Sequence, residues 1–490
     1  MTPETTDILL TGNWSARRTE RTVPRRPGAN LTLAERRGLL ILGDLLLVNA
    51  ALILAAVLWL DFVVHAETLL AYGKWFITLS VVWLAFAFTL DLYNPQRAAS
   101  VTAGLFNGGL AALLTGLIYQ FIPWLTPPPG RRLLYVGLTL FIILVILAWR
   151  AIYARFFFQP SFRRRVLVVG QDAATQQLVA ELQAAGGVER ANPLRGTGYQ
   201  VVAALEQLPG PDAHTLDPAH ALVRLARSTG ADEVLVAESV ALQPGLHEAL
   251  LDCREIGIRV TPLTVAYERL TSRLPVAYAE RDLNLITNGD DAPLQRLYVA
   301  SKRLADIGLS LVGLAVMLVL LPFIALANRF TSPGPLFYRQ QRVGRGGCPF
   351  TLIKLRTMTP DAEEATGAVW AADHDARVTA VGRWLRRMRI DELPQCINVL
   401  AGAMSIIGPR PERPQFVGEI SAALPIYRAR HAVRPGITGW AQIRYRYGNS
   451  VEDARIKLEY DLYYVKHAGF ALDLLIFLQT FPTMLFMAGQ

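Results

Sequence analysis

Two adjacent carboxylates, Asp391 and Glu392, stand in the stretch RIDELPQ, residues 389–395, just downstream of several arginines. Acids in such surroundings are either part of a charged surface patch or groups held in a cationic pocket for chemistry. Without a nearby histidine to complete a triad, the plausible roles are a carboxylate nucleophile at phosphorus and a ligand for a hard cation such as Mg²⁺. The stretch therefore raises the hypothesis of phosphate chemistry.

Three blocks of basic residues accompany this pair. Each block alone could be a solvated face or a membrane-surface patch. Three of them around one acidic pair favour phosphate handling, because a guanidinium group can hold phosphate oxygens through two parallel hydrogen bonds. The blocks are Arg339, Arg342, Arg345, Lys354 and Arg356; Arg377, Arg383, Arg386, Arg387 and Arg389; and Arg410, Arg413, Arg428, Arg430 and Arg434.

Pro394 predicts how the acidic pair is held. Proline suits the first turn of a helix, so we expect a helix through QCINVLAG with Asp391 and Glu392 at or near its N-terminus. The positive end of that helix would favour a phosphate and keep both carboxylates ionised. Helix capping by Asp391 is the alternative, and it accounts for one acid but not for two.

The composition indicates a protein with both membrane and soluble parts. Of the 490 residues, 52% are hydrophobic and 18% charged, and the net charge is +9. This charge fits contact with anionic phospholipid or phosphorylated substrates, and on charge alone also with nucleic acid. The three cysteines lie in no CxxC or CxxH spacing and the histidines form no HxxxH pair. Neither a disulfide framework nor a zinc site is therefore indicated.

Four apolar stretches follow a polar segment, residues 1–38, which reads as a disordered basic tail. The stretches, at 39–60, 75–93, 101–125 and 133–149, are each about long enough to cross a bilayer. They predict a four-helix transmembrane bundle over 39–150. The arginine-rich flanks before and after it should both be cytoplasmic, so we expect a multi-pass membrane protein.

Residues 163–265 alternate between short apolar runs and helical patterns. This alternation predicts a small parallel, Rossmann-like α/β domain. The sequence VLVVGQDAATQQ after its first strand lacks GxGxxG, so Gly170 is a weak nucleotide signal and a structural or regulatory module is favoured. Residues 266–300 are interpreted as a linker.

A fifth apolar stretch, 304–327, has basic residues on both flanks. A full crossing would export one of these flanks, whereas a helix that enters the membrane and returns keeps both inside. Pro322 supplies a cause for the turn, because proline removes a backbone hydrogen bond and kinks a helix. A simple fifth crossing is the alternative.

Four segments of the C-terminal region share their motifs with a known family. They are SPGPLFYRQQRVG, FTLIKLRTM, IDELPQCINVLAGAMSIIGPRPERPQFV and RHAVRPGITGWAQIRYRYGNSVEDARIKLEYDLYYVKH. Over about 300–490 the chain resembles the bacterial polyprenyl-phosphate hexose-1-phosphate transferases, which initiate exopolysaccharide and lipid-linked glycan assembly. The preceding crossings and α/β domain resemble the long members of that family in architecture.

The resemblance implies a C-terminal α/β-type monotopic catalytic domain, 301–490, on a re-entrant helix. It also implies a reaction in two steps. Asp391 would attack the β-phosphorus of a UDP-sugar, releasing UMP and leaving a sugar-phosphoryl aspartate. Undecaprenyl phosphate would then take the sugar phosphate, and Glu392 would help to hold Mg²⁺.

Further roles follow from the same resemblance. Lys354, Arg356, Arg386, Arg410 and Arg434 would bind the substrate phosphates, and Trp440 and Gln442 would shape the nucleotide side of the pocket. The catalytic domain would lie on the cytoplasmic face, with no nucleic acid as partner and a homodimer as one option. UDP-glucose is the expected donor and UDP-galactose the second choice.

Two alternatives of other classes stay open. One is an inactive membrane scaffold of a polysaccharide assembly complex, which the intact Asp-Glu pair disfavours. The other is a membrane-tethered nucleotide-sugar oxidoreductase or dehydratase built on residues 163–265, which the missing GxGxxG disfavours.

Overall fold

The protein is described by a computed structural model in which the chain forms two compact units, Met1–Thr271 and Ser272–Gln490. Each unit is considered by itself. The structure describes residues 33–60, 62–94, 101–122, 124–127, 132–157, 164–170, 175–176, 179, 199–205, 218–237, 245–279, 293–359, 362, 377–445 and 451–485. Most of the basic tail expected over 1–38 lies outside these residues.

The first unit begins with apolar helices that share one hydrophobic core. Two of them, spanning Glu35–Leu60 and Leu133–Tyr153, are long and apolar enough to cross a membrane, while Gly73–Thr89 and Gly104–Tyr119 are shorter apolar segments. Many apolar side chains on their outer faces are exposed, Leu144 at 67% among them, as expected of lipid-facing positions. The helices are α1 (Leu33–Leu60), α2 (Ala66–Ala71), α3 (Gly73–Thr89), α5 (Val101–Tyr119) and α6 (Arg132–Phe157).

A buried ion pair joins the first and last of these helices. Arg150 of α6 donates from Nη2 to Oδ2 of Asp44 in α1 at 2.5 Å, and both side chains are buried. The same guanidinium group donates from Nη1 to the backbone oxygen of Leu92 at 3.3 Å. Asp44 is therefore a partner in helix packing.

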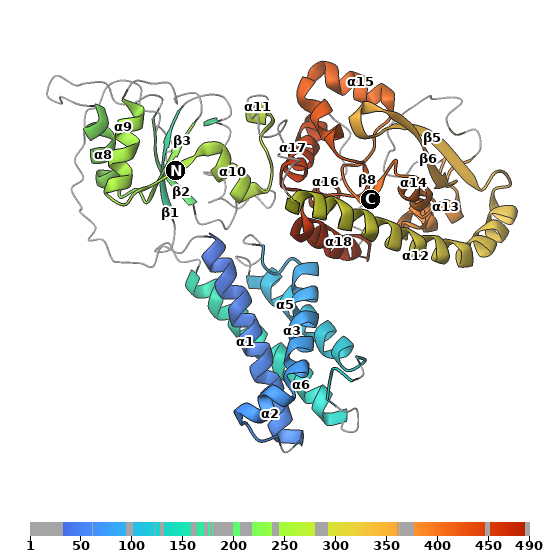
Figure 1. Ribbon diagram of the computed structural model, residues 1–490, viewed down its shortest axis with the longest axis horizontal. Coiled ribbons are helices and arrows are strands. Elements are labelled where there is room, and N and C mark those ends of the chain that lie inside the picture. The colour runs from blue at the N-terminus through green and yellow to red at the C-terminus, as the bar shows by residue number, and fades with distance from the viewer. Residues whose placement is uncertain are drawn as a thin grey trace, which may run out of the picture. The chain divides into compact units, whose positions relative to one another are not determined.

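A parallel sheet follows, as the alternating pattern predicts. Its strand order is β2-β1-β3-β4, and every strand pair is parallel. Figure 1 shows α8 and α9 on one face of the sheet and α10 on the other. Most of the helix expected over 172–185 lies outside the described residues. The strands are β1 (Arg164–Val169), β2 (Tyr199–Leu205), β3 (Glu233–Val236) and β4 (Arg259–Pro262), and the helices are α8 (Pro218–Thr229), α9 (Leu246–Glu255) and α10 (Leu263–Thr271).

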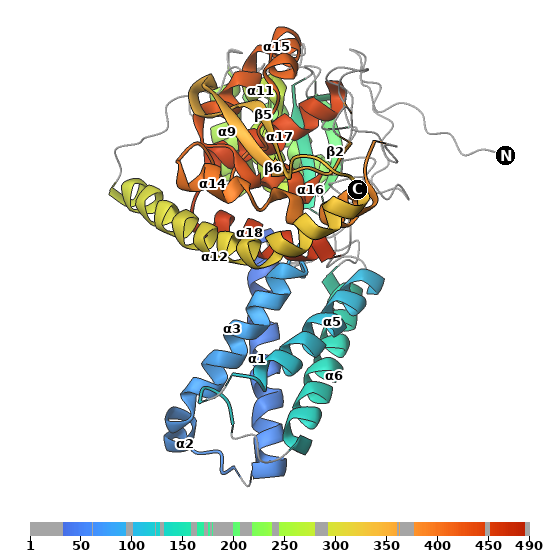
Figure 2. The same ribbon diagram turned by 90° about the vertical axis from the view of Figure 1, so that its right-hand side faces the viewer.

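The second unit is built on one long helix, α12 (Pro293–Thr331), which has Pro322 in its interior. It begins well before residue 304 and is long and apolar enough to cross a membrane, with only 11% of its most apolar stretch buried. Figure 2 shows that the helix bends along its length. The missing backbone hydrogen bond at a proline is a known cause of such bends.

The remainder of the second unit is mostly helical, with two small sheets in its described part. An antiparallel hairpin joins β5 (Phe337–Val343) to β6 (Pro349–Leu355), and β7 (Ser405–Ile407) pairs in parallel with β8 (Gly436–Thr438). The α/β type expected for this domain is thus reduced to two-stranded elements among helices. These are α11 (Val276–Ala279), α13 (Ala380–Arg387), α14 (Gln395–Leu400), α15 (Pro414–Ala423), α16 (Trp440–Arg444), α17 (Val451–His467) and α18 (Phe470–Leu485).

Much of the stretch 266–300 differs from the linker that we expected. Its first residues complete α10, which ends at Thr271, and its last residues belong to α12, which starts at Pro293. Between them, Leu274 and Val276 are 1% and 6% exposed and pack into the core of the second unit. Such apolar residues, spaced too irregularly to give a periodic pattern, are hard to assign to a core from the sequence.

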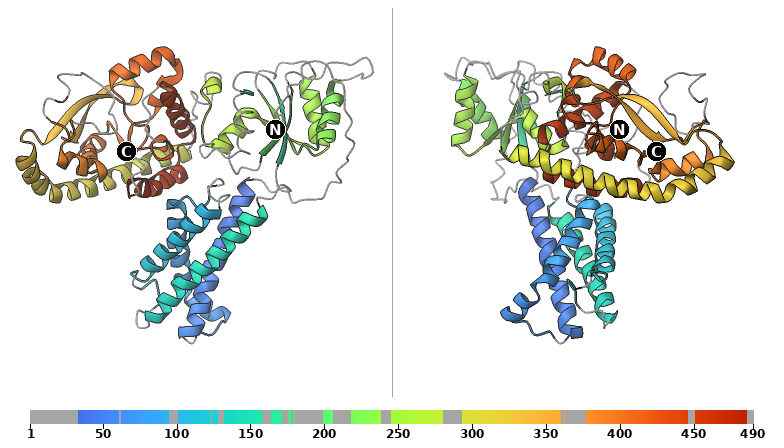
Figure 3. Two further views of the ribbon diagram at one scale, coloured as in Figure 1. Left: turned by 180° about the vertical axis from the view of Figure 1, so that it is seen from behind. Right: turned by 45° about the vertical axis from the view of Figure 1, so that its right-hand side comes forward.

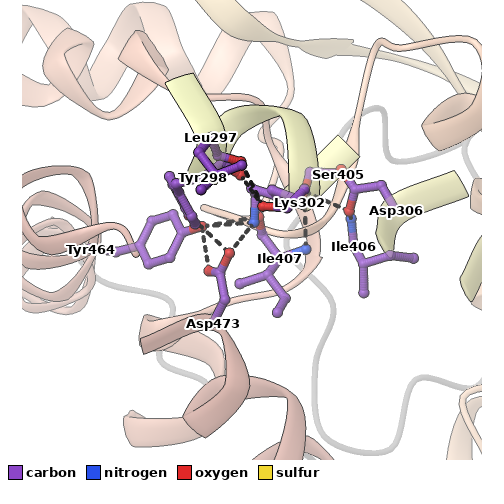
Figure 4. A network of polar contacts seen from close by, with 10 residues as sticks. Leu297, Tyr298, Lys302, Asp306, Ser405, Ile406, Ile407, Tyr464 and Asp473 are labelled. Atoms are coloured by element: carbon purple, nitrogen blue, oxygen red, sulfur yellow. Dashed lines mark hydrogen bonds and ion pairs between the residues drawn. The ribbon is translucent and has the colours of Figure 1, made fainter. Parts of the chain in front are cut away.

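A polar network fastens α12 to the rest of its unit. Asp473, in the first turn of α18, accepts hydrogen bonds from Lys302 (2.7 Å), Tyr298 (2.8 Å) and Tyr464 (2.9 Å). Figure 4 shows these side chains converging on the carboxylate, and next to them Asp306 accepting from Ser405. Figure 3 shows α12 and α18 along the same side of the unit. The network thus holds α12, the helix with the exposed apolar stretch, against the rest of the second unit.

Replacing Asp473 by asparagine should destabilise the second unit by about 1–3 kcal/mol, because one carboxylate oxygen becomes an amide that faces hydrogen-bond donors. The measurement is thermal unfolding of the detergent-solubilised protein, with a lower Tm expected for Asp473→Asn. Glu419→Gln, which alters an exposed carboxylate on α15, serves as the control. An equal Tm in the two variants would contradict the anchoring role.

Candidate active site

The acidic pair lies in a single 3₁₀ turn, Ile390–Glu392, between α13 and α14. Arg389 enters this turn with φ of 54°, a left-handed conformation that costs an L-residue roughly 1–2 kcal/mol. Pro394 directly precedes α14, close to the place predicted for it, but α14 has only six residues. Because so short a helix has a weak dipole, the positive charge at the pair has to come from side chains.

Three cations surround one oxygen of Glu392. Its Oε1 lies 3.2 Å from Arg410 Nη2, 3.4 Å from Arg389 Nη1 and 3.6 Å from Lys354 Nζ. Burial alone would raise the pKa of Glu392, but Lys354, Arg410 and Arg389 outweigh it and lower this pKa to about 2. Glu392 is therefore a permanent anion that gathers the cations of the site.

Asp391 has the opposite environment. Its side chain is 7% exposed, and its Oδ1 has no hydrogen-bond partner among the described residues. Burial and the adjacent Glu392 raise the pKa of Asp391 to about 6, against the charges of Lys354, Arg386 and Arg389. Asp391 is therefore ionised at neutral pH but loses its charge as the pH falls through about 6, whereas Glu392 keeps its charge there. Two neighbouring acids with pKa values driven apart can take different chemical roles.

The cations come from separate parts of the second unit. Lys354 lies on β6, Arg386 on α13 and Arg410 in the loop 408–411 after β7. Burial lowers the pKa of Lys354 although Glu392 opposes this effect. Arg386 donates from Nε to Thr357 Oγ1 at 2.9 Å, which holds its guanidinium group near Asp391. Predicted residues far apart in the sequence thus meet at one acidic pair.

Arg356 has a different role from the phosphate contact that we expected. Its guanidinium group is buried and donates to the backbone oxygens of Pro335 (2.6 Å) and Ser332 (2.5 Å), and to Ser332 Oγ (3.0 Å). These bonds close the connection between α12 and β5. Arg356, two residues after Lys354, therefore stabilises the fold, because its guanidinium group donates to Pro335 and Ser332.

Three other predicted residues, Arg434, Trp440 and Gln442, lie in or beside the layer formed by β7 and β8. Trp440 is 2% exposed, and the guanidinium group of Arg444 lies 4.5 Å above its ring. Gln442 donates from Nε2 to the backbone oxygen of Ile437 at 3.0 Å. The backbone oxygen of Arg434 lies very close to Gly408. A side chain at position 408 would collide with this oxygen. These residues support the loop of Arg410 rather than the acidic pair itself.

Two further arginines belong to the predicted basic blocks, although the sequence indicated an individual role for neither of them. One is Arg389, the third cation around Glu392. The other is Arg430, which donates from Nη2 to the backbone oxygen of Arg410 (2.9 Å) and to Asp461 Oδ2 (2.7 Å). The pair Arg430 and Asp461 is buried, at 5% and 2% side-chain exposure. In the sequence, the signal for this pair is the presence of two acids, Glu459 and Asp461, within the otherwise apolar run LEYDLYYV.

Comparison with known proteins shows similarity to one family and to several of its members. Residues 297–487 match the model of the bacterial sugar transferases. The UDP-glucose:undecaprenyl-phosphate glucose-1-phosphate transferase of Caulobacter vibrioides is 42% identical over 204 residues, which cover 41% of this chain and 76% of that protein. The Xanthomonas campestris enzyme of the same name is 32% identical over 53% of this chain and 54% of its own length.

Another relative is named for a different sugar substrate. The UDP-N-acetylgalactosamine-undecaprenyl-phosphate N-acetylgalactosaminephosphotransferase of Aeromonas hydrophila is 44% identical over 189 residues. The match spans 39% of this chain and 44% of that relative. The match to the family model, residues 297–487, includes the acidic pair.

Proposed function

Because the chain belongs to the bacterial sugar transferase family, we propose that it transfers a hexose-1-phosphate from a UDP-sugar to undecaprenyl phosphate. The products would be undecaprenyl-diphospho-hexose and UMP, the first membrane step of exopolysaccharide synthesis. One observation carries the proposal: two adjacent buried carboxylates with opposite pKa shifts lie among Lys354, Arg386, Arg389 and Arg410.

In the first step, Asp391 acts as the nucleophile. A carboxylate oxygen forms a bond to the β-phosphorus, and the bond from that phosphorus to the bridging oxygen breaks, so that UMP leaves with this oxygen. The raised pKa of Asp391, about 6, leaves the carboxylate ionised at neutral pH. Its Oδ1, which has no hydrogen-bond partner in the described chain, is the atom suited to the attack.

In the second step, an oxygen of undecaprenyl phosphate attacks the same phosphorus and Asp391 is released as a carboxylate. Both transfers move a phosphoryl group between oxygens, so positioning and charge neutralisation carry the catalysis. Lys354, Arg386 and Arg410 are assigned to the diphosphate and lipid phosphate. Glu392 holds Arg410 and Lys354 in place at 3.2 and 3.6 Å.

The acidic pair also suits Mg²⁺ as proposed cofactor. Mg²⁺ takes one or two protein carboxylates and completes its shell with water and substrate phosphates. The described residues hold no cluster of three metal-ligating side chains, which is compatible with such a sparse set of protein donors. Glu392 stays the proposed metal ligand, through an oxygen other than the Oε1 that the cations occupy. Bound Mg²⁺ would neutralise charge on the diphosphate.

We propose that α1, α3, α5 and α6 cross the bacterial inner membrane and that α12 enters it and returns at Pro322. Lys302 and Arg329 flank the apolar part of α12 on both sides, which favours keeping both ends in the cytoplasm. Exposed apolar residues on α12, such as Leu318 and Phe323, would face lipid. This topology places the acidic pair on the cytoplasmic face.

UDP-glucose is the proposed donor, since relatives that cover more of this chain carry glucose in their names. The N-acetylgalactosamine relative keeps a second sugar class open. The test is incubation of the purified protein with Mg²⁺, undecaprenyl phosphate and a panel of UDP-sugars, with UMP as the readout. Acceptor-dependent release of UMP is the expected result. Release from none of the sugars would leave the scaffold alternative standing.

The rate of the first step should depend on the ionisation of Asp391. Since its pKa is raised from 3.8 to about 6, the carboxylate is protonated, and unable to attack, as the pH falls through 6. Single-turnover release of UMP should therefore fall about tenfold per pH unit below this value. A rate that stays constant down to pH 4.5 would contradict the assignment of the nucleophile.

A further inference from the structure

A segment upstream of the family match completes the core of the second unit. Residues 272–279, here called the strap, precede the matched residues 297–487. Three of its side chains, Leu274, Val276 and Ala279, are 1%, 6% and 1% exposed. They belong to one hydrophobic cluster with Tyr427, Ile420, Ala454, Leu458 and Leu462.

Polar contacts hold the strap at its first residues. Arg273 lies over the ring of Tyr460 at 4.9 Å, and its Nη1 is 3.7 Å from Glu459 Oε2. The amide of Leu274 donates to the backbone oxygen of Glu459 at 3.0 Å. Ser272 has φ of 54°, a conformation that a serine keeps only where its surroundings impose it.

The carbonyl of Ser272 connects the strap to the site. It accepts a hydrogen bond from Trp440 Nε1 at 3.0 Å. Gly439, just before Trp440, lies so close to Gly408 that an added Cβ would stand 2.2 Å from the Gly408 oxygen. Gly408 donates to the backbone oxygen of Thr438 at 2.9 Å and begins the loop 408–411, which carries Arg410. The path therefore leads by direct contacts from the strap to the residue that binds Glu392.

A second path leads through the hydrophobic cluster. Tyr427, which shares that cluster with Leu274, accepts a hydrogen bond from Arg430 Nη1 at 2.8 Å. Arg430 in turn donates to the backbone oxygen of Arg410 at 2.9 Å. Two independent routes from the strap thus end on the same loop.

We propose that the strap is a positioning element of the active site, which holds Trp440 and Arg430 so that the loop 408–411 presents Arg410 to Glu392. The proposal rests on the transferase function proposed above. It extends the working catalytic unit upstream of the family match, to Ser272. The strap itself touches no reacting group.

The test uses the full chain with Arg273→Met, which removes the contact to Glu459, and Leu274→Ala, which empties the core position. Arg273→Lys keeps the charge and should restore most of the activity. Arg269→Met, on an exposed position of α10, is the matched control. The burst of UMP counts the competent enzyme, and kcat is expressed per burst site. We expect kcat to fall about tenfold in Arg273→Met and Leu274→Ala, since catalysis is sensitive to misplaced charge.

Hydrogen exchange gives a readout that needs no activity. Amides within 405–412 should exchange faster in Arg273→Met and Leu274→Ala, and at the native rate in Arg269→Met. Two results in Arg273→Met and Leu274→Ala would overturn the proposal. One is exchange that rises only within 272–279 and 455–462, and the other is a kcat per burst site within twofold of the native value. Should no UDP-sugar yield UMP even with the native protein, the proposed function fails, and the exchange result alone still decides the role of the strap. If Leu274→Ala does not fold, Arg273→Met and its lysine counterpart decide.

Discussion

Asp391→Asn is expected to lower acceptor-dependent UMP release by about 10³-fold or more while raising the thermal stability of the protein at pH 8. The loss of activity follows from the proposed role, because an amide cannot form the acyl-phosphate bond to the β-phosphorus. The side chain keeps its shape, so the cations around Glu392 stay in place. UMP release and thermal unfolding, measured on the same preparation, check the loss of activity and the gain in stability.

The gain in stability follows from the raised pKa of Asp391. In the unfolded chain the group ionises near its ordinary value of 3.8, and in the folded protein only near 6. The wild type therefore loses stability as the pH rises through this window, by on the order of 2–3 kcal/mol. The neutral asparagine avoids this loss, so its advantage should be present at pH 8 and vanish near pH 4.

The control for Asp391→Asn is Glu419→Gln, which removes one exposed carboxylate and should change neither property. A fully active Asp391→Asn would exclude this residue as the nucleophile. An inactive variant with a lower Tm at pH 8 would show that Asp391 is stabilised by the cations rather than strained by burial.

Glu392→Gln is expected to reduce UMP release by about 10²–10³-fold and, in contrast to Asp391→Asn, to destabilise the protein. Arg410, Arg389 and Lys354 all lose the anion that they share within 3.6 Å. Removing one partner of a largely buried ion cluster costs on the order of 3 kcal/mol. The measurements are the kcat for UMP release and the Tm at pH 8.

The pH profile of this variant supplies its sharpest check. The charge of Glu392 raises the pKa of Asp391, so its removal should move the acid limb of single-turnover UMP release below pH 6. Glu412→Gln, which alters a more exposed acid that pairs with Arg342, is the comparison. An acid limb that stays in place would mean that Glu392 and Asp391 do not act as an electrically coupled pair.

A large part of the fold could be predicted from local patterns in the sequence. The continuous apolar stretches predicted the helices α1, α3, α5 and α6, and the alternation of short apolar runs with helical patterns after residue 163 predicted the parallel sheet. The Asp-Glu pair was recognisable because its two acids are adjacent in the sequence and Pro394 marks the start of the next helix. In each case the decisive contacts lie within a few residues of one another.

What the sequence could not reveal depends on distant partners. Arg356 and Arg410 are chemically alike, yet one is held by the backbone of Ser332 and the other binds Glu392. The chain between α12 and β5 brings backbone oxygens to Arg356, and this tertiary arrangement determines the different contacts of the two arginines. The different pKa values of Asp391 and Glu392 are equally non-local, because the cations that separate them come from β6, α13 and the loop 408–411.

The ion pair between Asp44 and Arg150 has a consequence for how the protein is made. The two residues are 106 positions apart. At a synthesis rate of about 5–20 residues per second, Asp44 reaches the insertion machinery roughly 5–20 s before its partner has been polymerised. In the proposed topology, α1 waits during that interval with an uncompensated carboxyl group. The stable insertion of α1 in the bilayer therefore depends on the later synthesis of α6. The helices assemble only after both have been translated.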